Sequence, residues 1–246
     1  MEKEANSWFK SWFDTEQYHE LYGHRDEKEA QYFIIKLCDF MKISPGSLCA
    51  DLACGKGRHS NTLASLGMKV LGLDLSENSI DYAKKNAIPG AEFATHDMRL
   101  PLPKNDFSAI FNLFTSFGYF DNIEDDEKVI QNQYEGLKKG GVFIQDYINA
   151  EAVTINLPKK ETIIKPKTRF EIHKFVEDGR IKKNIKFKVN GEAYDYTENV
   201  KIYSMEQLQA LHIKAGFSVK HIFGNYALED FDSKTSPRLI MISEKC

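Results

Sequence analysis

The sequence predicts an α/β fold in which helices cover both faces of a mostly parallel β-sheet. Short apolar runs alternate with helical stretches, and a glycine-containing turn follows the first run. Strands and helices that alternate in this way form right-handed βαβ units, because parallel neighbours need a crossover connection. The length of 246 residues fits one such domain with a modest insertion, and 42% hydrophobic and 28% charged residues are ordinary for a globular chain.

The individual elements follow from periodicity and from cap and turn residues. Residues 1–43 are expected to form a helical cap with many aromatic side chains, ending at a Ser-Pro-Gly turn. Strands are expected at 47–52, 69–75, 91–95, 107–113, 142–147, 217–223 and 238–243, and helices at 58–66, 76–87, 123–138 and 204–215. Ser76 and Ser204 are predicted to cap their helices, and Gly140 with Gly141 to end the third.

The rhythm changes between residues 150 and 203. Apolar and polar side chains alternate strictly from Ile181 to Val189, and Asp-Gly and Asn-Gly pairs at 178–179 and 190–191 are hairpin signals. This segment is predicted to be an antiparallel insertion of three or four strands. The chain then divides into a helical cap (1–43), a core (44–149), the β insertion (150–203) and a segment that completes the core (204–246).

Charge and cysteine content argue against several classes of function. The net charge of -3 gives no general attraction to nucleic acid. Residues 159–188 hold eleven Lys or Arg against four Asp or Glu, which suits a solvated face better than an acidic acceptor or RNA, since no aromatic residues interleave as a base-stacking surface requires. The four cysteines lack metal-ligand spacing, so no metal site is expected. No apolar run approaches the ~20 residues of a membrane span, and a cytoplasmic chain without membrane contact is expected.

Three acidic residues follow three successive predicted strands. Asp51 begins a loop in which Gly55 and Gly57 allow a sharp bend and the close approach of a ligand. Asp74 ends the second strand, where a carboxylate can accept hydrogen bonds from both hydroxyls of a ribose. The alternative role for Asp74 is that of an ordinary acidic residue at a helix N-terminus. Asp97 and Met98 follow the third, where the acid can accept an adenine amine and the thioether can pack on the ring.

Together these motifs resemble those of class I S-adenosylmethionine-dependent methyltransferases, over about residues 47–148 and the closing elements. The resemblance implies a Rossmann-like methyltransferase fold with a seven-stranded, mostly parallel sheet whose last strand is antiparallel. Ala53 stands where the family motif has its first glycine, as in relatives whose motif is Asp-x-Ala-Cys-Gly-x-Gly. The residues implied to bind S-adenosylmethionine are Asp51, Ala53, Cys54, Gly55, Gly57, Asp74, Leu75, Asp97, Met98, Asn112 and Leu113. Tyr22 and Arg25 are candidates to close over it from the helical cap, with Arg25 gripping the methionine carboxylate.

In architecture the chain is most similar to small-molecule N-methyltransferases, including those that dimethylate amino sugars. Those enzymes share the Phe-x-Ser-x-Gly-Tyr pattern found at 114–119 and a β insertion after the fifth strand that forms a lid or a dimer contact. The resemblance implies methyl transfer to N or O of a small-molecule acceptor, with a homodimer through the insertion as a further expectation. Tyr119, Tyr147 and His173 are the candidate catalytic residues.

Three alternatives remain open at the level of sequence. The chain could methylate RNA or another macromolecule, or bind S-adenosylmethionine without turnover. A NAD-dependent oxidoreductase is disfavoured, because Ala53, Gly55 and Arg58 do not fit the Gly-x-Gly-x-x-Gly fingerprint of that class.

Overall fold

Two β-sheets and eight helices are built from residues 8–22 and 27–246, the part of the chain that this computed structural model describes. The strands of the large sheet are β1 (Leu48–Leu52), β2 (Lys69–Asp74), β3 (Ala91–Thr95), β4 (Phe107–Asn112), β5 (Leu137–Ile148), β10 (Phe217–Phe223) and β11 (Arg238–Lys245). The second sheet holds β6 (Lys159–Ile164), β7 (Arg169–Glu177), β8 (Arg180–Val189) and β9 (Glu192–Lys201). The helices are α1 (Trp8–Phe13), α2 (Glu16–Tyr22), α3 (Glu27–Met41), α4 (Arg58–Ser65), α5 (Glu77–Lys85), α6 (Ile123–Gly136), α7 (Ala150–Thr154) and α8 (Met205–Ala215).

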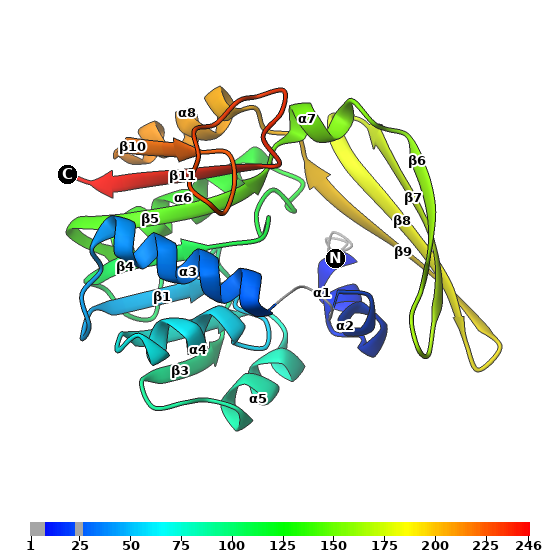
Figure 1. Cartoon of the computed structure of the whole chain (residues 1–246), viewed down its shortest axis with the longest axis horizontal. Coiled ribbons are helices and arrows are strands. Elements are labelled where there is room, and N and C mark those ends of the chain that lie inside the picture. The colour runs from blue at the N-terminus through cyan, green and yellow to red at the C-terminus, as the bar shows by residue number, and fades with distance from the viewer. Residues whose placement is uncertain (1–7, 23–26) are drawn as a thin grey trace, which may run out of the picture.

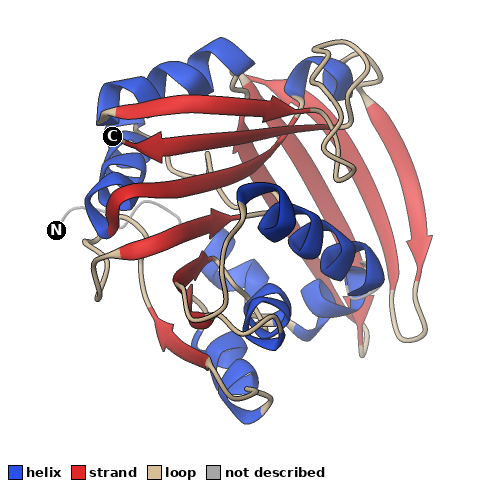
Figure 2. Cartoon of the chain, turned by 60° about the vertical axis from the view of Figure 1, so that its left-hand side comes forward, coloured by secondary structure: helices blue, strands red, loops and turns tan. Residues whose placement is uncertain are grey.

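The large sheet has the order β10-β11-β5-β4-β1-β2-β3, and β11 runs antiparallel to both of its neighbours (Figure 1). The pairs β1–β2, β1–β4, β2–β3 and β4–β5 are parallel. Helices cover both faces of this sheet (Figure 2), which explains why its central strands are almost continuously apolar. The predicted fold class is confirmed, including the antiparallel last strand and the four-stranded antiparallel insertion.

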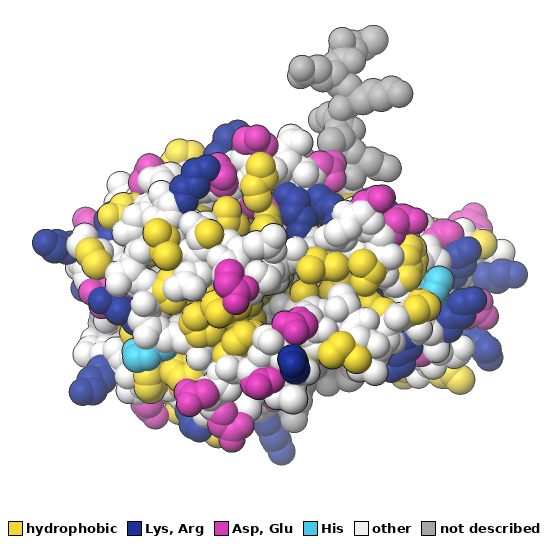
Figure 3. All heavy atoms as spheres, turned by 90° about the horizontal axis from the view of Figure 1, so that it is seen from above, with side chains coloured by type: hydrophobic (Ala, Val, Ile, Leu, Met, Phe, Trp, Pro, Cys, Tyr) yellow, Lys and Arg dark blue, Asp and Glu magenta, His cyan; other side chains and the backbone are white. Residues whose placement is uncertain are grey.

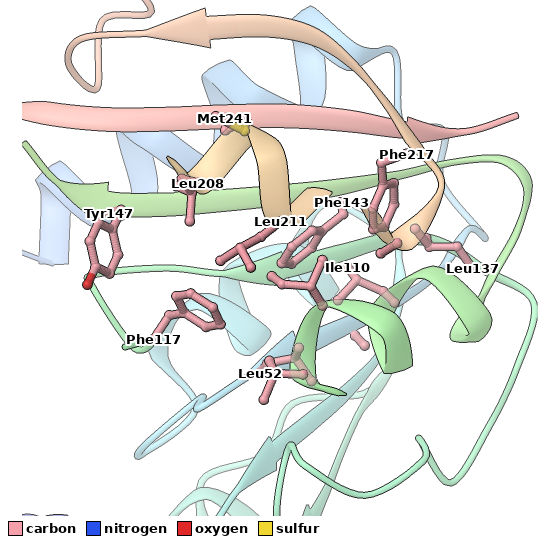
Figure 4. Packing of buried hydrophobic residues seen from close by; sticks show 14 of the residues in the cluster. Leu52, Ile110, Phe117, Leu137, Phe143, Tyr147, Leu208, Leu211, Phe217 and Met241 are labelled. Atoms are coloured by element: carbon pink, nitrogen blue, oxygen red, sulfur yellow. The ribbon is translucent and has the colours of Figure 1, made fainter. Parts of the chain in front are cut away.

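Each face of the large sheet carries its own hydrophobic core. On one face α6 and α8 pack over Ile110, Phe143 and Met241, with Leu208 and Leu211 pointing down from α8 (Figure 4). On the other, side chains of α3 and α4 pack against the opposite side of the same strands. The sheet is therefore held between two apolar layers, which leaves its strand ends as the place for polar chemistry.

Two element boundaries differ from the sequence-based expectations. The helix expected at 123–138 ends at Gly136, and β5 begins at Leu137, so the glycine pair lies inside the strand. Leu137 already pairs with Phe107, and Gly140, with φ +72°, lets β5 shift register before it pairs with β4 again. The expected cap at 1–43 is divided into α1, α2 and α3, and α7 precedes the insertion strands.

Gly57 sets how closely α4 approaches the sheet. It is the N-cap residue of α4 with φ +81°, and a Cβ atom there would lie 2.6 Å from Cζ of Phe93 on β3. A Cβ atom added at Gly72 on β2 would lie 2.5 Å from Cδ1 of the same ring. Both glycines are needed for close contact with Phe93, and together they bring the loop after β1 down onto the edge of the sheet.

Helices α1 and α2 lie between the two sheets (Figure 1). Trp12 and Leu21 are buried against Phe170 and Ile185 of the second sheet. At the other side Asp14 accepts hydrogen bonds from Ser76 Oγ and Asn78 Nδ2, both at 2.6 Å, at the start of α5. These two helices therefore bridge the core and the insertion.

The second sheet is joined to the loop after β4. Lys201 N donates to Gly118 O at 2.9 Å, and Arg180 Nη2 donates to Phe120 O at 2.7 Å. Tyr147 OH donates to Lys201 O at 2.7 Å from within the core. The loop at 113–119 is thus held by β9 on one side and by the large sheet on the other. Within the described ranges, no helix is long and apolar enough to cross a membrane.

Candidate active site

A cleft with three compartments follows the carboxyl edge of β1, β2 and β4. The largest has a volume of about 670 Å³ and opens between α2 and α4; the others measure about 130 Å³ and about 60 Å³. Ala53 lines all three, Gly55 lines the first two, and Asp74 lines the second and third. These shared residues make the compartments adjacent parts of one site, at the edge where open α/β sheets bind ligands.

The loop after β1 is strained and tied to the end of β2. Ala53 has φ +53°, a left-handed conformation that costs an L-residue roughly 1–2 kcal/mol, and Gly55 has φ +54°. Gly55 N donates to Asp74 Oδ2 at 2.8 Å, and Cys54 N donates to Leu73 O at 3.1 Å. Cys54 lines the largest compartment, and burial raises the pKa of its thiol well above the ordinary value. Contacts to β2 therefore hold this loop in its strained conformation.

Asp51 is buried at the base of the largest compartment. Ser60 Oγ on α4 donates to its Oδ2 at 2.6 Å. Burial raises the pKa of Asp51 to about 7, and the nearby Asp74 adds to this, whereas the Ser60 hydrogen bond opposes it. Asp51 can therefore change its charge near neutral pH.

Asp74 organises the turn between β2 and α5. Its Oδ1 accepts Ser76 N at 2.8 Å, and its Oδ2 accepts Gly55 N at 2.8 Å. The helix cap is Ser76, whose Oγ accepts Ser79 N at 3.0 Å, as the sequence predicted. Burial raises the pKa of Asp74, and its backbone hydrogen bonds oppose the rise. Each carboxylate oxygen keeps a second lone pair for a hydroxyl donor.

The smallest compartment is an apolar slot with a polar end. Leu75, Met98 and Phe120 line it, together with His96 and Asp97. Arg99 grips Asp97 with Nε at 3.0 Å from Oδ1 and Nη2 at 2.6 Å from Oδ2. His96 Nε2 is buried and has no hydrogen-bond partner among the described residues, and burial lowers the pKa of its ring. Apolar walls with polar groups at one end suit a flat heteroaromatic ring with polar edge atoms.

The middle compartment brings together residues that are distant in the sequence. Aromatic rings from α1, α2 and the loop after β4 line it, namely Trp8, Phe13, Tyr18, Tyr22, Phe114 and Tyr119. Glu198 on β9 also lines it, and its Oε1 accepts Trp12 Nε1 at 2.8 Å and Tyr22 OH at 2.5 Å. Trp8 Nε1 is buried without a hydrogen-bond partner in the described part of the chain. Trp8 Nε1 beside the middle compartment and His96 Nε2 beside the smallest one thus both lack a partner among the described residues. This is consistent with a ligand that spans the two compartments.

Sequence reasoning missed Trp8 and Glu198 as site residues. Trp8 belongs to an uneven aromatic series, and Glu198 lies on a strand whose face toward the cleft is set by packing against α1 and α2. Nothing local in the sequence marks either position. His96 carried a local signal, because it directly precedes Asp97 at a strand end.

Most of the candidate cofactor residues line the cleft. They are Asp51, Ala53, Cys54, Gly55, Asp74, Leu75, Asp97, Met98, Leu113 and Tyr22. Gly57 supports the loop from behind, and Asn112 is buried, donating to Ser116 O at 3.3 Å. Arg25 lies outside the described residues.

Two of the three catalytic candidates lie away from the cleft and need correction. Tyr147 is fully buried in the core (Figure 4), its hydroxyl is bonded to Lys201 O, and burial raises its pKa well above the ordinary value. His173 alternates with Phe170 and Ile172, which pack toward α1 and α2, so its ring lies on the outer face of the second sheet. Tyr119 lines the cleft, and its OH donates to Thr115 O. Within the described ranges no cluster of three or more His, Cys, Asp or Glu is arranged to hold a metal ion.

Known proteins share both the sequence pattern and the fold. The model of the methyltransferase domain family matches residues 43–209. The dTDP-3-amino-3,4,6-trideoxy-alpha-D-glucopyranose N,N-dimethyltransferase of Streptomyces venezuelae is 33% identical over 94 residues, which is 38% of this chain and 39% of that protein. The ubiquinone biosynthesis O-methyltransferase of Coxiella burnetii is 30% identical over 107 residues, which is 42% of this chain and 44% of that protein. The chain thus aligns with less than half the length of each.

The chain belongs to the methyltransferase domain family. A solved S-adenosylmethionine-dependent methyltransferase from Clostridium acetobutylicum has the same fold, with a TM-score of 0.78 and 19% identity over 93% of this chain and 96% of that one. The prediction of a methyltransferase is therefore confirmed by the family, and that of the Rossmann-like methyltransferase fold by the solved structure.

Asp51 should make the stability of the ligand-free chain depend on pH. Its pKa rises from 3.8 in the unfolded reference to about 7 when folded, so its contribution to stability is full below about pH 4 and is lost as the pH rises through about 7. Between pH 5 and pH 8 the thermal midpoint of the Asp51→Asn variant should rise relative to wild type. Scanning calorimetry measures the thermal midpoints, and Asp81→Asn, at an exposed position of α5, is the control. Parallel profiles for wild type and Asp51→Asn would show that Asp51 is already ionised at pH 5.

Proposed function

We propose that this chain transfers the methyl group of S-adenosylmethionine to the nitrogen of a small amine. The observation that carries the proposal is the middle compartment, which six Trp, Tyr and Phe side chains and Glu198 line together with Gly55 and Asp74. Aromatic faces attract cations, and a carboxylate accepts hydrogen bonds from an ammonium group. The aligned Streptomyces protein, named as an N,N-dimethyltransferase of an amino sugar, supports an amine acceptor.

The cofactor is assigned to the strand-end residues. The loop Ala53–Gly57 would hold its methionine part, Asp74 its ribose, and the slot of Leu75, His96 and Met98 its adenine. When bound, S-adenosylmethionine supplies a methyl group activated by a sulfonium. The contribution of the chain is to align the amine with that methyl and to exclude water, and proximity alone can supply up to ~7–11 kcal/mol in well-oriented systems.

Glu198 is assigned to bind the acceptor amine. Trp12 and Tyr22 hold its Oε1 by hydrogen bonds, and Lys183 Nζ, which balances its charge, lies 3.9 Å from Oε2. An ammonium group must lose a proton before its nitrogen can attack the methyl, and the Glu198 carboxylate is assigned to accept a hydrogen bond from that group and to take the proton. Tyr119 is assigned to the wall beside the amine, packed against Trp8 at a ring separation of 5.3 Å.

A small acceptor suits this cleft better than RNA. The middle compartment is covered by α1, α2 and the second sheet, which leaves room for a small molecule. Lysines on the outer face of the insertion are paired, as in Lys186–Asp195 at 3.4 Å and Lys182 with Glu177. On the face in Figure 3, basic and acidic side chains are interspersed rather than gathered into one basic surface.

A homodimer through the second sheet is a further part of the proposal. Strand β6 pairs on one side with β7 and is an edge of that sheet, and Ile164 at its end is 74% exposed. An exposed edge strand is a template for pairing with another chain. Light scattering of the whole chain is expected to give twice the monomer mass, and Ile164→Lys should lower it. A monomer at all concentrations would exclude this assembly.

The cofactor assignment predicts the effect of removing the Asp74 carboxylate. Asp74→Ala should weaken S-adenosylmethionine binding at least about tenfold, or 1.4 kcal/mol, because the ribose loses its acceptor. Titration calorimetry measures the affinity, and Asp81→Ala on α5 is the control. Unchanged affinity in a folded Asp74→Ala variant would remove Asp74 from the site.

The acceptor assignment predicts turnover with amines. S-adenosylhomocysteine should form with small primary or secondary amines and not with the matched alcohols. Glu198→Gln should raise the KM for the amine at least about tenfold and leave cofactor affinity within about threefold. The control is Glu192→Gln, an exposed position on the same strand.

Three results would contradict the acceptor assignment. Turnover of the alcohols alone would place the methyl on oxygen, and turnover of RNA alone would exclude a small acceptor. Cofactor binding without any product would favour a binding module.

A further inference from the structure

A buried ion pair lies behind the loop that faces the cleft. Asp146 near the end of β5 is fully buried, and Arg238 at the start of β11 places its Nε 2.7 Å from Asp146 Oδ1. Tyr226 OH donates to Asp146 Oδ2 at 3.2 Å, and Arg238 N donates to Gly224 O at 2.9 Å. Neither Asp146 nor Arg238 lines any of the three compartments of the cleft. An effect of either residue on the cleft must therefore act through the residues that it contacts.

Three hydrogen bonds join this pair to two consecutive residues of the loop. Phe114 N donates to Asp146 Oδ2 at 2.8 Å, and Thr115 N donates to Asp146 O at 3.0 Å. Arg238 Nη2 donates to Thr115 Oγ1 at 2.8 Å. Both backbone amides and one side chain of the turn are thus bound by the same two residues.

The turn needs such support because its backbone is unfavourable. Phe114 has φ +58° and Thr115 has φ +63°, so two successive residues with side chains adopt the left-handed region. A β-branched residue such as threonine is a genuine outlier there, and such conformations persist where surrounding contacts determine them. The contacts of Asp146 and Arg238 fill that role here.

The turn determines one wall of the cleft. The Phe114 ring stacks on His59 with centroids 4.9 Å apart, and Ser116 lines both of the larger compartments. Tyr119 OH donates to the carbonyl of Thr115 itself. A relaxed turn would move all three side chains relative to Gly55 and Asp74.

We infer that Asp146 and Arg238 are positioning residues, which hold the Phe114–Thr115 turn in its left-handed form and thereby place the wall against which the acceptor amine meets the methyl group. The inference rests on the proposed function for what is positioned. The hydrogen bonds and backbone angles that carry it are independent of the acceptor.

The decisive variant is Thr115→Gly, which removes the Oγ1 contact with Arg238. It also gives the backbone of the turn access to other conformations. Glycine adopts φ near +63° without strain, so the thermal midpoint should stay at or above that of wild type. We expect kcat to fall at least about tenfold while cofactor affinity stays within about threefold. Asp106→Gly is the matched control, since exposed Asp106 has φ +66° outside the cleft, and its kcat should not change.

Two further measurements complete the test. Thr115→Ser keeps the oxygen that accepts from Arg238 and should restore kcat to within about threefold of wild type. Hydrogen exchange of residues 113–119 should become faster in Thr115→Gly and stay slow in Thr115→Ser.

Each contrary result overturns the inference. Unchanged kcat in Thr115→Gly would do so, as would joint loss of kcat, cofactor affinity and thermal stability, which indicates a general structural role. Unchanged hydrogen exchange of residues 113–119 in Thr115→Gly also overturns the inference, and this test does not need turnover. If wild type turns over no amine, that result by itself refutes only the proposed function.

Discussion

The hydrogen bond from Gly55 N to Asp74 Oδ2 joins the two strand ends on which the site depends. It ties the strained loop after β1 to the turn after β2, and Ala53, Gly55 and Asp74 together line every compartment of the cleft. Parallel strands bring their carboxyl ends to one edge, and this contact, with that of Cys54 N to Leu73 O, joins two of those ends. Both the smallest and the middle compartment extend from it.

Local signals in the sequence were sufficient for the scaffold. Ser204 caps α8 with a reciprocal bond from Gln207, and Gly216 ends the same helix with φ +103°, as their residue types predict. The period-two pattern of β8 gave the insertion, and the three acids at strand ends marked the edge that carries the cleft. Each of these features depends on residues within a few positions of one another.

Features that depend on long-range packing could not be predicted. Glu198 meets Trp12 across 186 residues, and Arg238 meets Thr115 across 123. For His173, alternation alone gives two faces without telling which one α1 and α2 cover. Tyr147 lies near the end of β5, where its hydroxyl donates to Lys201 O of β9 inside the core.

The burial of Cys54 has a chemical consequence for an enzyme of this class. A thiolate is a strong nucleophile, whereas a protonated thiol is a poor one. Cys54 lies in the loop assigned to the methionine part of a methyl donor, and its raised pKa keeps it protonated at neutral pH. The raised pKa therefore disfavours the thiolate, which is the form of Cys54 that would attack an alkylating ligand in the cleft.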